Sequence, residues 1–373
     1  MTYFHVLWTR PQLNPGVAPE AQDLVLWDFE FLTWLLSALE ARRHGPLRLV
    51  TDARGALAVQ RVGLEWVYSG GISTALEAVP REVDPSIFWA AGKLYAYRSV
   101  SPPCVCVDMD AVLWQPLEPA APVMALHPEG KDWGWYRDDR QHFAPFGLEG
   151  PDWNWELDPF NTGVVYLGDA AVARFYVDTA TAFMERFSRE VCADPARRPA
   201  FTNAMVFAEQ RLLPMCSQRL GLTVAPVTRA MPGAAGLPLN PDCLHLWRAK
   251  LAYKLCPDAR LALLNWLIER LLHAFPEARP VLARWDLDHA KTRSEGGAVN
   301  PAELAQAQLG DLRFSLLRNV QGGINVTDLI SGVERDAVEG SMVWSGEIIR
   351  PEPGARFELE VIGLQSLKIQ TAA

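Results

Sequence analysis

Short apolar runs alternate with amphipathic segments along the first 110 residues of the chain. Buried strands are predicted over residues 3–9, 47–51, 66–68 and 104–107. Helices are predicted between them, over residues 21–43, 56–62 and 85–97. This alternation predicts an α/β domain whose mostly parallel sheet is covered by helices on both faces. Ligands of such sheets bind beyond the carboxyl ends of the strands.

The pattern changes towards the C-terminal end of the chain. A strand is predicted over residues 163–167, followed by helices over residues 171–189, 203–212 and 251–275. After the polar stretch 291–300, a short helix over residues 301–309 precedes β-like runs over residues 312–317 and 356–361. The last run alternates strictly between apolar and polar residues, as half-exposed antiparallel strands do. We therefore predict a domain over residues 1–294 and a small β-rich accessory region over residues 295–373.

Composition and charge narrow the possible functions. The 373 residues carry a formal net charge of −9, so a protein that binds the nucleic-acid backbone is not expected. His5, Arg10 and Pro11 interrupt any signal-peptide core, and no run of about 18 uncharged apolar residues could span a bilayer. We expect a cytoplasmic protein without a membrane span. The six cysteines include no C-x-x-C pair and are expected to be reduced core thiols rather than zinc ligands.

Asp108 and Asp110 directly follow the very apolar predicted strand over residues 104–107. Two carboxylates at the end of a buried strand are costly unless a positive group meets them. The usual partner is a divalent cation that bridges to phosphate. The alternative is that both residues only cap the turn after the strand, a frequent role of Asp.

The D-x-D motif, its place about 100 residues into the chain and the α/β segment before it resemble GT-A fold glycosyltransferases. The similarity is greatest to the glycogenin-like family 8 and to the family 32 enzymes. The resemblance implies a Rossmann-like nucleotide-diphospho-sugar transferase fold, with a mixed sheet flanked by helices and here a small C-terminal β-rich appendage. It also implies that Asp108 and Asp110 hold Mn²⁺ or Mg²⁺ against the diphosphate of a nucleotide-sugar, with UDP as the nucleotide.

Further segments match the same families in order. Lys93 stands on the predicted helix before the motif, where the resemblance expects a basic residue that faces the nucleotide-sugar; the alternative is that Lys93 and Arg98 form a solvated helix face. The segment 159–167 is similar to the family's F-N-[ST/A]-G pattern, which implies that Asn161 and Thr162 touch the donor sugar or the acceptor. By analogy with the fold, Trp8 and Thr9 would lie beside the base.

Two later matches depart from the family pattern. Glu209 and Gln210 occupy the place of an acidic residue and a glutamine, typically D-Q, that lies near the anomeric carbon or the acceptor in retaining members. The alternative is an exposed polar helix face. His245 fits the histidine that completes the metal site, and imidazole suits Mn²⁺ beside carboxylates. Lys250 is displaced by one residue from the lysine that meets the diphosphate.

The resemblance thus implies three sets of site residues. The catalytic residues are Asp110, Glu209 and Gln210. The residues that bind the nucleotide-sugar are Trp8, Thr9, Lys93, Asp108, Asn161, Thr162 and Lys250. The metal ligands are Asp108, Asp110 and His245.

Four of the 14 tryptophans fall within 23 residues, at Trp133, Trp135, Trp153 and Trp155. Aromatic faces stack on sugar rings, so this cluster could form the wall of a site for a saccharide or other hydroxyl acceptor. The alternative is a loop that uses the tryptophans as its own small core.

Three functions follow from these observations. The first is a metal-dependent glycosyltransferase of the hexosyltransferase type, for which the glycogenin-like similarity favours retention. The second is a haloacid-dehalogenase-type phosphohydrolase, in which Asp108 is the nucleophile and Asp110 the general acid. The third is a non-catalytic sugar-binding protein, whose binding would survive the loss of both carboxylates.

Overall fold

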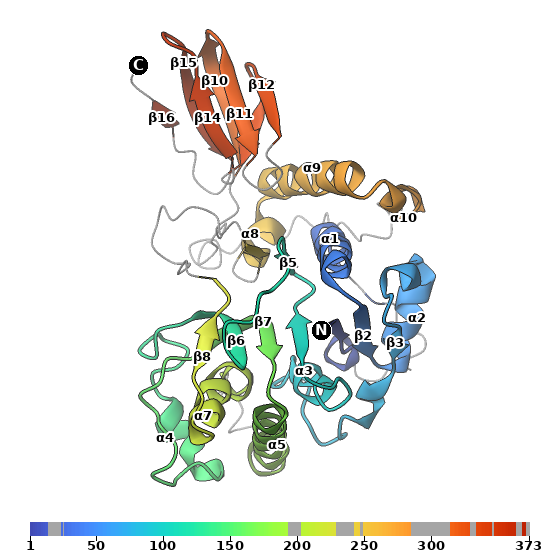
Figure 1. Ribbon diagram of the computed structural model, residues 1–373, viewed down its shortest axis with the longest axis vertical. Helices are drawn as coiled ribbons and strands as arrows, with labels where there is room; N and C mark the ends of the chain where they lie inside the picture. Colours follow the sequence, from blue (N-terminus) through green and yellow to red (C-terminus); the bar gives the residue numbers. More distant parts are fainter. Residues whose placement is uncertain are drawn as a thin grey trace. The chain divides into compact units, whose positions relative to one another are not determined.

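The structure, a computed structural model, describes residues 1–13, 24, 26–192, 203–228, 242–246, 249–284, 314–328, 333–344, 347–362 and 368–370. The chain divides into two compact units (Figure 1). Unit 1 comprises Met1–Val25, Ser37–Met109 and Pro116–Arg229. Unit 2 comprises Leu26–Leu36, Asp110–Gln115 and Ala230–Ala373. The boundary between them therefore falls inside the D-x-D motif.

A seven-stranded mixed sheet forms the centre of unit 1. Its strands, in spatial order, are β3 (Ile72–Ser73), β2 (Leu47–Thr51), β1 (Thr2–Leu7), β4 (Cys104–Val107), β7 (Phe160–Leu167), β6 (Val123–Pro128) and β8 (Val224–Pro226). Strand β7 runs antiparallel to its neighbours β4 and β6, and the other pairs are parallel. Because β1 and β4 are parallel neighbours, their carboxyl ends lie at one edge of the sheet.

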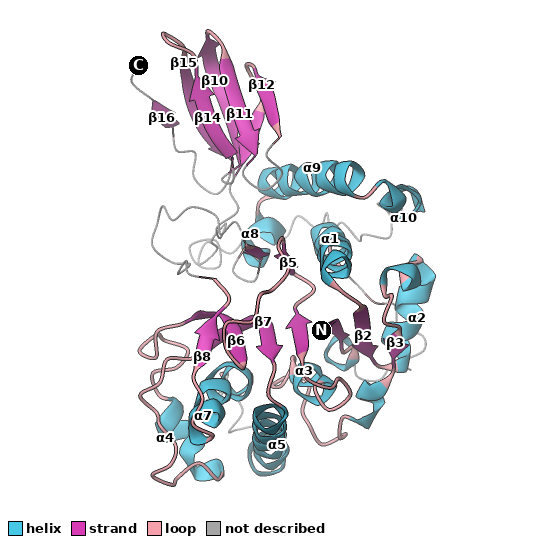
Figure 2. Ribbon diagram, in the orientation of Figure 1, coloured by secondary structure: helices cyan, strands magenta, loops and turns pink. Residues whose placement is uncertain are grey.

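Helices flank this sheet (Figure 2). They are α2 (Ala53–Val62), α3 (Ala91–Ala96), α4 (Asp139–Phe143), α5 (Ala170–Phe187), α6 (Ala204–Val206) and α7 (Leu212–Arg219), and the chain of α1 (Asp28–His44) belongs partly to each unit. Two π-helical segments, Ser188–Cys192 and Phe207–Arg211, continue α5 and join α6 to α7. Between the helices and the sheet lies an apolar core rich in aromatic rings, in which Phe143 stacks on Phe207 with centroids 4.6 Å apart.

In its described residues, unit 2 contains a two-stranded antiparallel ladder, part of α1, further helices and a β-rich region. The ladder pairs β5 (Ala111–Leu113) with β9 (Cys243–His245). The helices are α8 (Lys250–Leu255), α9 (Pro257–Ala274) and α10 (Arg279–Arg284). One sheet orders β13 (Met342–Trp344), β10 (Phe314–Gln321), β15 (Arg356–Ile362) and β16 (Lys368–Gln370), and the other orders β12 (Glu334–Ala337), β11 (Ile324–Asp328) and β14 (Glu347–Pro351). Buried residues such as Leu317, Val326 and Phe357 form the core of this region.

The predicted fold class is confirmed: the protein has a mixed α/β sheet flanked by helices and a C-terminal β-rich region. Strands 47–51 and 104–107 have the predicted bounds. Five predictions lie at least partly outside the described residues: the start of helix 21–43, the polar stretch 291–300, helix 301–309, the start of the β-like run 312–317 and the boundary at residues 294 and 295.

Three element predictions are wrong in detail. Residues 66–68 do not form a strand; Glu65–Val67 form a 3₁₀ turn, and the strand follows at Ile72 after Gly71, which adopts a φ of 88°. The helix predicted over residues 85–97 is shortened to Ala91–Ala96. The helix over 251–275 is broken at Pro257, whose ring cannot continue a helix and which holds Cys256 in an extended conformation.

Candidate functional site

Asp108 and Asp110 continue directly from the carboxyl end of β4, all of whose residues are buried. The main-chain N–H of Asp108 donates to Gly163 O at 2.8 Å, which fixes the chain at this point beside β7. The Asp108 side chain is 33% exposed. Because only Met109 separates the two aspartates, their Cα atoms cannot be more than about 7.6 Å apart. Chain connectivity alone therefore keeps the two carboxylates close to one another.

Lys93 of α3 lies at the centre of a buried polar cluster. Its Nζ is 2.7 Å from Asp108 Oδ1 and 2.7 Å from Glu209 Oε1, and it donates to the main-chain oxygen of Thr162. Burial by itself lowers the pKa of Lys93, but the carboxylates of Asp108 and Glu209 raise it well above its ordinary value. The side chain is only 5% exposed, so the alternative of a solvated helix residue is wrong.

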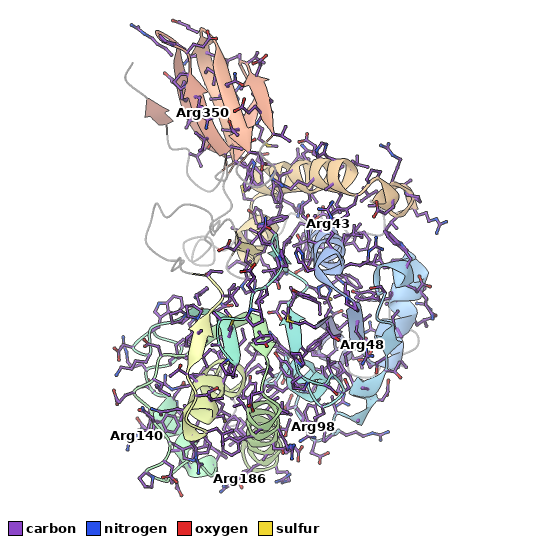
Figure 3. All side chains as sticks on the ribbon, in the orientation of Figure 1. Arg43, Arg48, Arg98, Arg140, Arg186 and Arg350 are labelled. Atoms are coloured by element: carbon purple, nitrogen blue, oxygen red, sulfur yellow. The ribbon has the colours of Figure 1, made fainter. Side chains whose placement is uncertain are left out.

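Arg98, by contrast, lies at the surface, with 48% of its side chain exposed. Its guanidinium donates to Thr181 Oγ1 at 2.8 Å and lies 3.3 Å from Asp178 Oδ1, both on α5 (Figure 3). The two basic residues near α3 therefore separate into one buried cation and one surface cation.

Glu209 connects this cluster to strand β7. Thr162 Oγ1 donates to Glu209 Oε1 at 2.8 Å, and the Tyr176 hydroxyl donates to the main-chain oxygen of Glu209 at 2.6 Å. Thr162 and Glu209 are both buried. The segment Phe207–Arg211 is π-helical, and the alternative of an exposed polar face is wrong for Glu209 and for Arg211, which is also buried.

A second polar chain runs from Asn161 to Gln210. Asn161 Nδ2 donates to Glu129 Oε1 at 3.2 Å, and Asn161 Oδ1 accepts from Gly163 N at 3.0 Å. The Tyr136 hydroxyl forms short contacts with Glu129 Oε2 and with the side-chain amide of Gln210. Asn161, Glu129 and Tyr136 are buried, whereas Gln210 is half-buried.

Sequence reasoning missed Glu129 and Tyr136. Glu129 directly follows strand β6, so a carboxylate after an apolar run was the available signal. Tyr136 stands between exposed neighbours in a turn-rich segment, and no periodicity there marks it as buried.

Asp110 and His245 are brought together inside unit 2. Strand β5 pairs with β9 so that Ala111 lies opposite His245, and Leu246 N donates to Asp110 O at 3.0 Å. Asp110 Oδ2 is 3.7 Å from His245 Nε2 and 2.7 Å from Lys250 Nζ. Burial raises the pKa of Asp110, but Lys250 and then His245 oppose this effect and lower the pKa to about 2. Asp110 is therefore ionised at neutral pH.

Asp108, Asp110 and His245 form a group that could hold a metal ion. Carboxylates and imidazole are both ligands that divalent metal ions use in proteins. In the structure, the charge of each carboxylate is balanced by a lysine, Lys93 for Asp108 and Lys250 for Asp110. The residues present therefore fit a divalent cation that would share the carboxylates with these two ammonium groups.

Trp8 and Thr9 follow β1 at the edge of the sheet that also carries Asp108. Thr9 donates through its main-chain N–H and its hydroxyl to Asp52, at 2.8 and 2.9 Å. Trp8 packs so closely on Gly92 that a Cβ atom at residue 92 would lie 2.4 Å from Trp8 Cβ. Both residues are buried, and their place beside a base stays a prediction.

Two of the four clustered tryptophans belong to the core. Trp153 stacks on Phe175 with an interplanar angle of 6°, and Trp155 stacks on Phe207 with an angle of 13°. Both tryptophans are at most 9% exposed, so their ring faces are used inside the protein. An acceptor wall made of all four tryptophans is therefore not supported.

Trp133 and Trp135 are exposed by 39% and 49%. Asn203 Nδ2 donates to the main-chain oxygen of Trp135 at 2.7 Å and to Asp139 Oδ1 at 2.8 Å, which ties this loop to the start of α6. Among the four tryptophans, Trp133 and Trp135 are therefore the two exposed ones.

The cysteines are free thiols, as predicted. Five of the six are buried and Cys256 is half-buried. Burial raises the pKa of Cys104 and of Cys216 to about 12.

Residues 1–237 match the family of unknown function DUF6734. The chain belongs to this family. None of the curated proteins matches the chain. Among solved structures it is similar to one titled PaToxG Glycosyltransferase, at 10% identity and a TM-score of 0.28 over 59% of this chain and 78% of that chain. It is also similar to mouse xyloside xylosyltransferase 1 in its apo form, at 12% identity and a TM-score of 0.28 over 60% of this chain and 84% of that chain.

These similarities to solved structures are low. Among the residues that the structure describes, no helix is both long enough and apolar enough to cross a membrane.

Proposed function

We propose that this protein is a metal-dependent glycosyltransferase that transfers a hexosyl group from a UDP-sugar to an acceptor hydroxyl, with retention. One observation carries the proposal. Four residues from four separate sequence segments meet in one hydrogen-bonded cluster: the buried Lys93, Thr162 and Glu209 and the partly exposed Asp108. These segments are far apart in the sequence, and their side chains meet at the carboxyl end of β4. Sheets of α/β proteins bind ligands at such strand ends.

Asp108, Asp110 and His245 would hold Mn²⁺ or Mg²⁺ in this proposal. When bound, the cation would neutralise the charge that develops on the leaving diphosphate. Lys250, whose Nζ lies 2.7 Å from Asp110 Oδ2, would contact the diphosphate. Lys93 would hold Asp108 and Glu209 in place from inside the fold.

The remaining residues act on the donor and the acceptor. Trp8 and Thr9 would lie beside the base, and Asn161 and Thr162 would shape the donor-sugar pocket from β7. Asp110, Glu209 and Gln210 would act at the reacting centre. We place the acceptor, a saccharide or another hydroxyl compound, at the exposed rings of Trp133 and Trp135. Residues 1–294 would form the catalytic domain and residues 295–373 the accessory region.

Calorimetric titration of UDP, with and without Mn²⁺, tests the proposal on the full chain. We expect Mn²⁺-dependent binding by the wild type and its loss in Asp108→Asn/Asp110→Asn. The control Asp178→Asn removes an exposed aspartate that pairs with Arg98 and should bind like the wild type. Release of UDP from a panel of UDP-sugars then identifies the donor.

Failure would take one of two forms. If the wild type does not bind UDP with Mn²⁺, the UDP-sugar proposal is overturned. If it hydrolyses p-nitrophenyl phosphate and loses that activity in Asp108→Asn, the phosphohydrolase replaces the glycosyltransferase.

A further inference from the structure

The Tyr136 hydroxyl contacts two oxygen-bearing side chains but has only one proton to donate. Its neighbours are Glu129 Oε2 and the side-chain amide of Gln210, whose Oε1 is the atom placed toward the phenol. Burial and then the nearby Glu129 charge raise the pKa of Tyr136 above its ordinary value, so the phenol keeps its proton. The question is therefore which neighbour receives this proton.

The Glu129 carboxylate determines which neighbour accepts the Tyr136 proton. A carboxylate accepts hydrogen bonds and cannot donate them, and an O–H donated to a carboxylate is stronger than one donated to a neutral amide. Both Glu129 oxygens face donors, since Asn161 Nδ2 donates to Oε1 at 3.2 Å and the phenol faces Oε2. The Tyr136 proton therefore goes to Glu129, and the phenol oxygen is left as an acceptor.

Gln210 must then meet Tyr136 with its NH₂ group. The oxygen and nitrogen of a glutamine amide are nearly equal in size, so the hydrogen-bond network determines which atom faces which neighbour. With Nε2 donating to Tyr136, the carbonyl oxygen Oε1 of Gln210 points away from the phenol. Gln210 is half-buried and directly follows Glu209, whose carboxylate contacts Lys93.

We propose that Glu129 and Tyr136 are positioning residues that fix the Gln210 amide with its carbonyl oxygen available to substrate. A fixed carbonyl dipole accepts a hydrogen bond from an acceptor hydroxyl or stabilises positive charge that develops at a sugar carbon. This use of the oxygen rests on the function proposed above, whereas the orientation of the amide does not. The arrangement also couples Gln210 to the loop that exposes Trp133 and Trp135, because Tyr136 belongs to that loop.

The orientation can be measured in the full chain without any ligand. Selective ¹⁵N-glutamine labelling gives side-chain amide signals, and Gln210→Ala identifies those of Gln210. We expect Gln210 Nε2 protons to exchange with water about tenfold more slowly than those of the exposed Gln60, which is the effect of one net hydrogen bond.

Three variants separate positioning from a general structural effect. Tyr136→Phe keeps the buried ring and removes the acceptor oxygen, so the protection of Gln210 should be lost. Glu129→Gln supplies an NH₂ group that can donate to the phenol, which releases the phenol proton to Gln210 and should also abolish the protection. Tyr176→Phe is the matched control, since it removes a buried hydroxyl that donates to the main-chain oxygen of Glu209, and protection should remain.

The proposal is overturned if Gln210 stays protected in Tyr136→Phe or in Glu129→Gln, or if the wild-type protons exchange as fast as those of Gln60. Because Glu129→Gln and Tyr136→Phe perturb different atoms, a folding failure of one leaves the other decisive. An absence of UDP binding together with protected Gln210 protons would reject the glycosyltransferase and leave the positioning intact.

Discussion

Lys93 Nζ and Asp108 Oδ1 lie 2.7 Å apart and form an ion pair in which the lysine is almost fully buried. The lysine also neutralises Glu209 at the same distance. One ammonium therefore compensates two carboxylates from elements far apart in the sequence, and its removal should cost more than a surface ion pair does.

We expect Lys93→Met to lower the free energy of unfolding by about 3–5 kcal/mol, because it leaves the buried carboxylate of Glu209 and the partly buried one of Asp108 without this cation. Urea denaturation measures this change. Lys131→Met, which breaks an exposed pair with Glu156, is the control and should give an unfolding curve that overlays the wild type. Equal curves for both variants would show that Lys93 is not a structural cation.

Lys250→Met should tighten Mn²⁺ binding in the absence of nucleotide. Lys250 Nζ lies 2.7 Å from Asp110 Oδ2 and competes with a metal ion for this oxygen. Its removal also takes one positive charge away from the metal site. We expect the Kd for Mn²⁺, measured by electron paramagnetic resonance, to fall by roughly 2- to 10-fold, consistent with a modest ion-pair energy. Lys254→Met on the same helix, which pairs with Glu30 at 3.1 Å, should leave the Kd unchanged. A weaker affinity in Lys250→Met would count against Asp110 as a ligand.

Asp139 should make stability depend on pH. Burial raises its pKa to about 8, although Arg211 opposes the shift. In the unfolded chain the residue loses its proton near pH 4, so between about pH 4 and 8 the folded state holds one more proton. The free energy of unfolding should therefore fall as pH rises through this window, by up to about 1.4 kcal/mol per pH unit.

Urea denaturation of Asp139→Asn tests this dependence. The variant should lose less stability than the wild type between pH 5 and 8, because its amide does not titrate. Asp152→Asn, at an exposed pair with Arg219, should follow the wild-type slope. If the free energy of unfolding changes with pH equally in the wild type and in Asp139→Asn, the raised pKa of Asp139 is refuted.

Gly92→Ala should destabilise the protein although alanine favours helices. The new Cβ would lie 2.4 Å from Trp8 Cβ, in a buried place where neither backbone can withdraw freely. Overpacking of this kind costs about 1–3 kcal/mol. Thermal unfolding measures the loss, and Gly134→Ala is the control because nothing lies within 4 Å of its added Cβ. An unchanged melting temperature in Gly92→Ala would mean that Trp8 can shift at no cost.

The sequence predicts those parts of the fold that depend on local patterns. The runs 47–51 and 104–107 have the predicted bounds. Each is a short, mostly buried run that a proline precedes and an aspartate follows, which is the pattern of a strand inside a covered sheet. Residues 66–68 fail because a three-residue apolar run fits a turn equally well.

Some residues of the candidate site can likewise be predicted from local patterns, whereas others depend on tertiary packing. Carboxylates that follow a buried strand are recognisable in the sequence, and Asp108 and Asp110 were found by this rule. Tyr136 and Gln210 are 74 residues apart along the chain, and no spacing rule connects residues whose contact depends on tertiary packing. The burial of Trp153 and Trp155 was likewise decided by Phe175 and Phe207, which are distant in the sequence.

The burial of the six free cysteines makes the number of reactive thiols a measure of whether the protein is folded. A thiol reagent added to the folded chain meets five buried sulfur atoms and one, Cys256, that is partly open at the junction of α8 and α9. Unfolding exposes the other five, so the number of titrated thiols rises from about one to six. Every variant above can thus be checked for global folding by counting sulfhydryl groups, without a label or a known ligand.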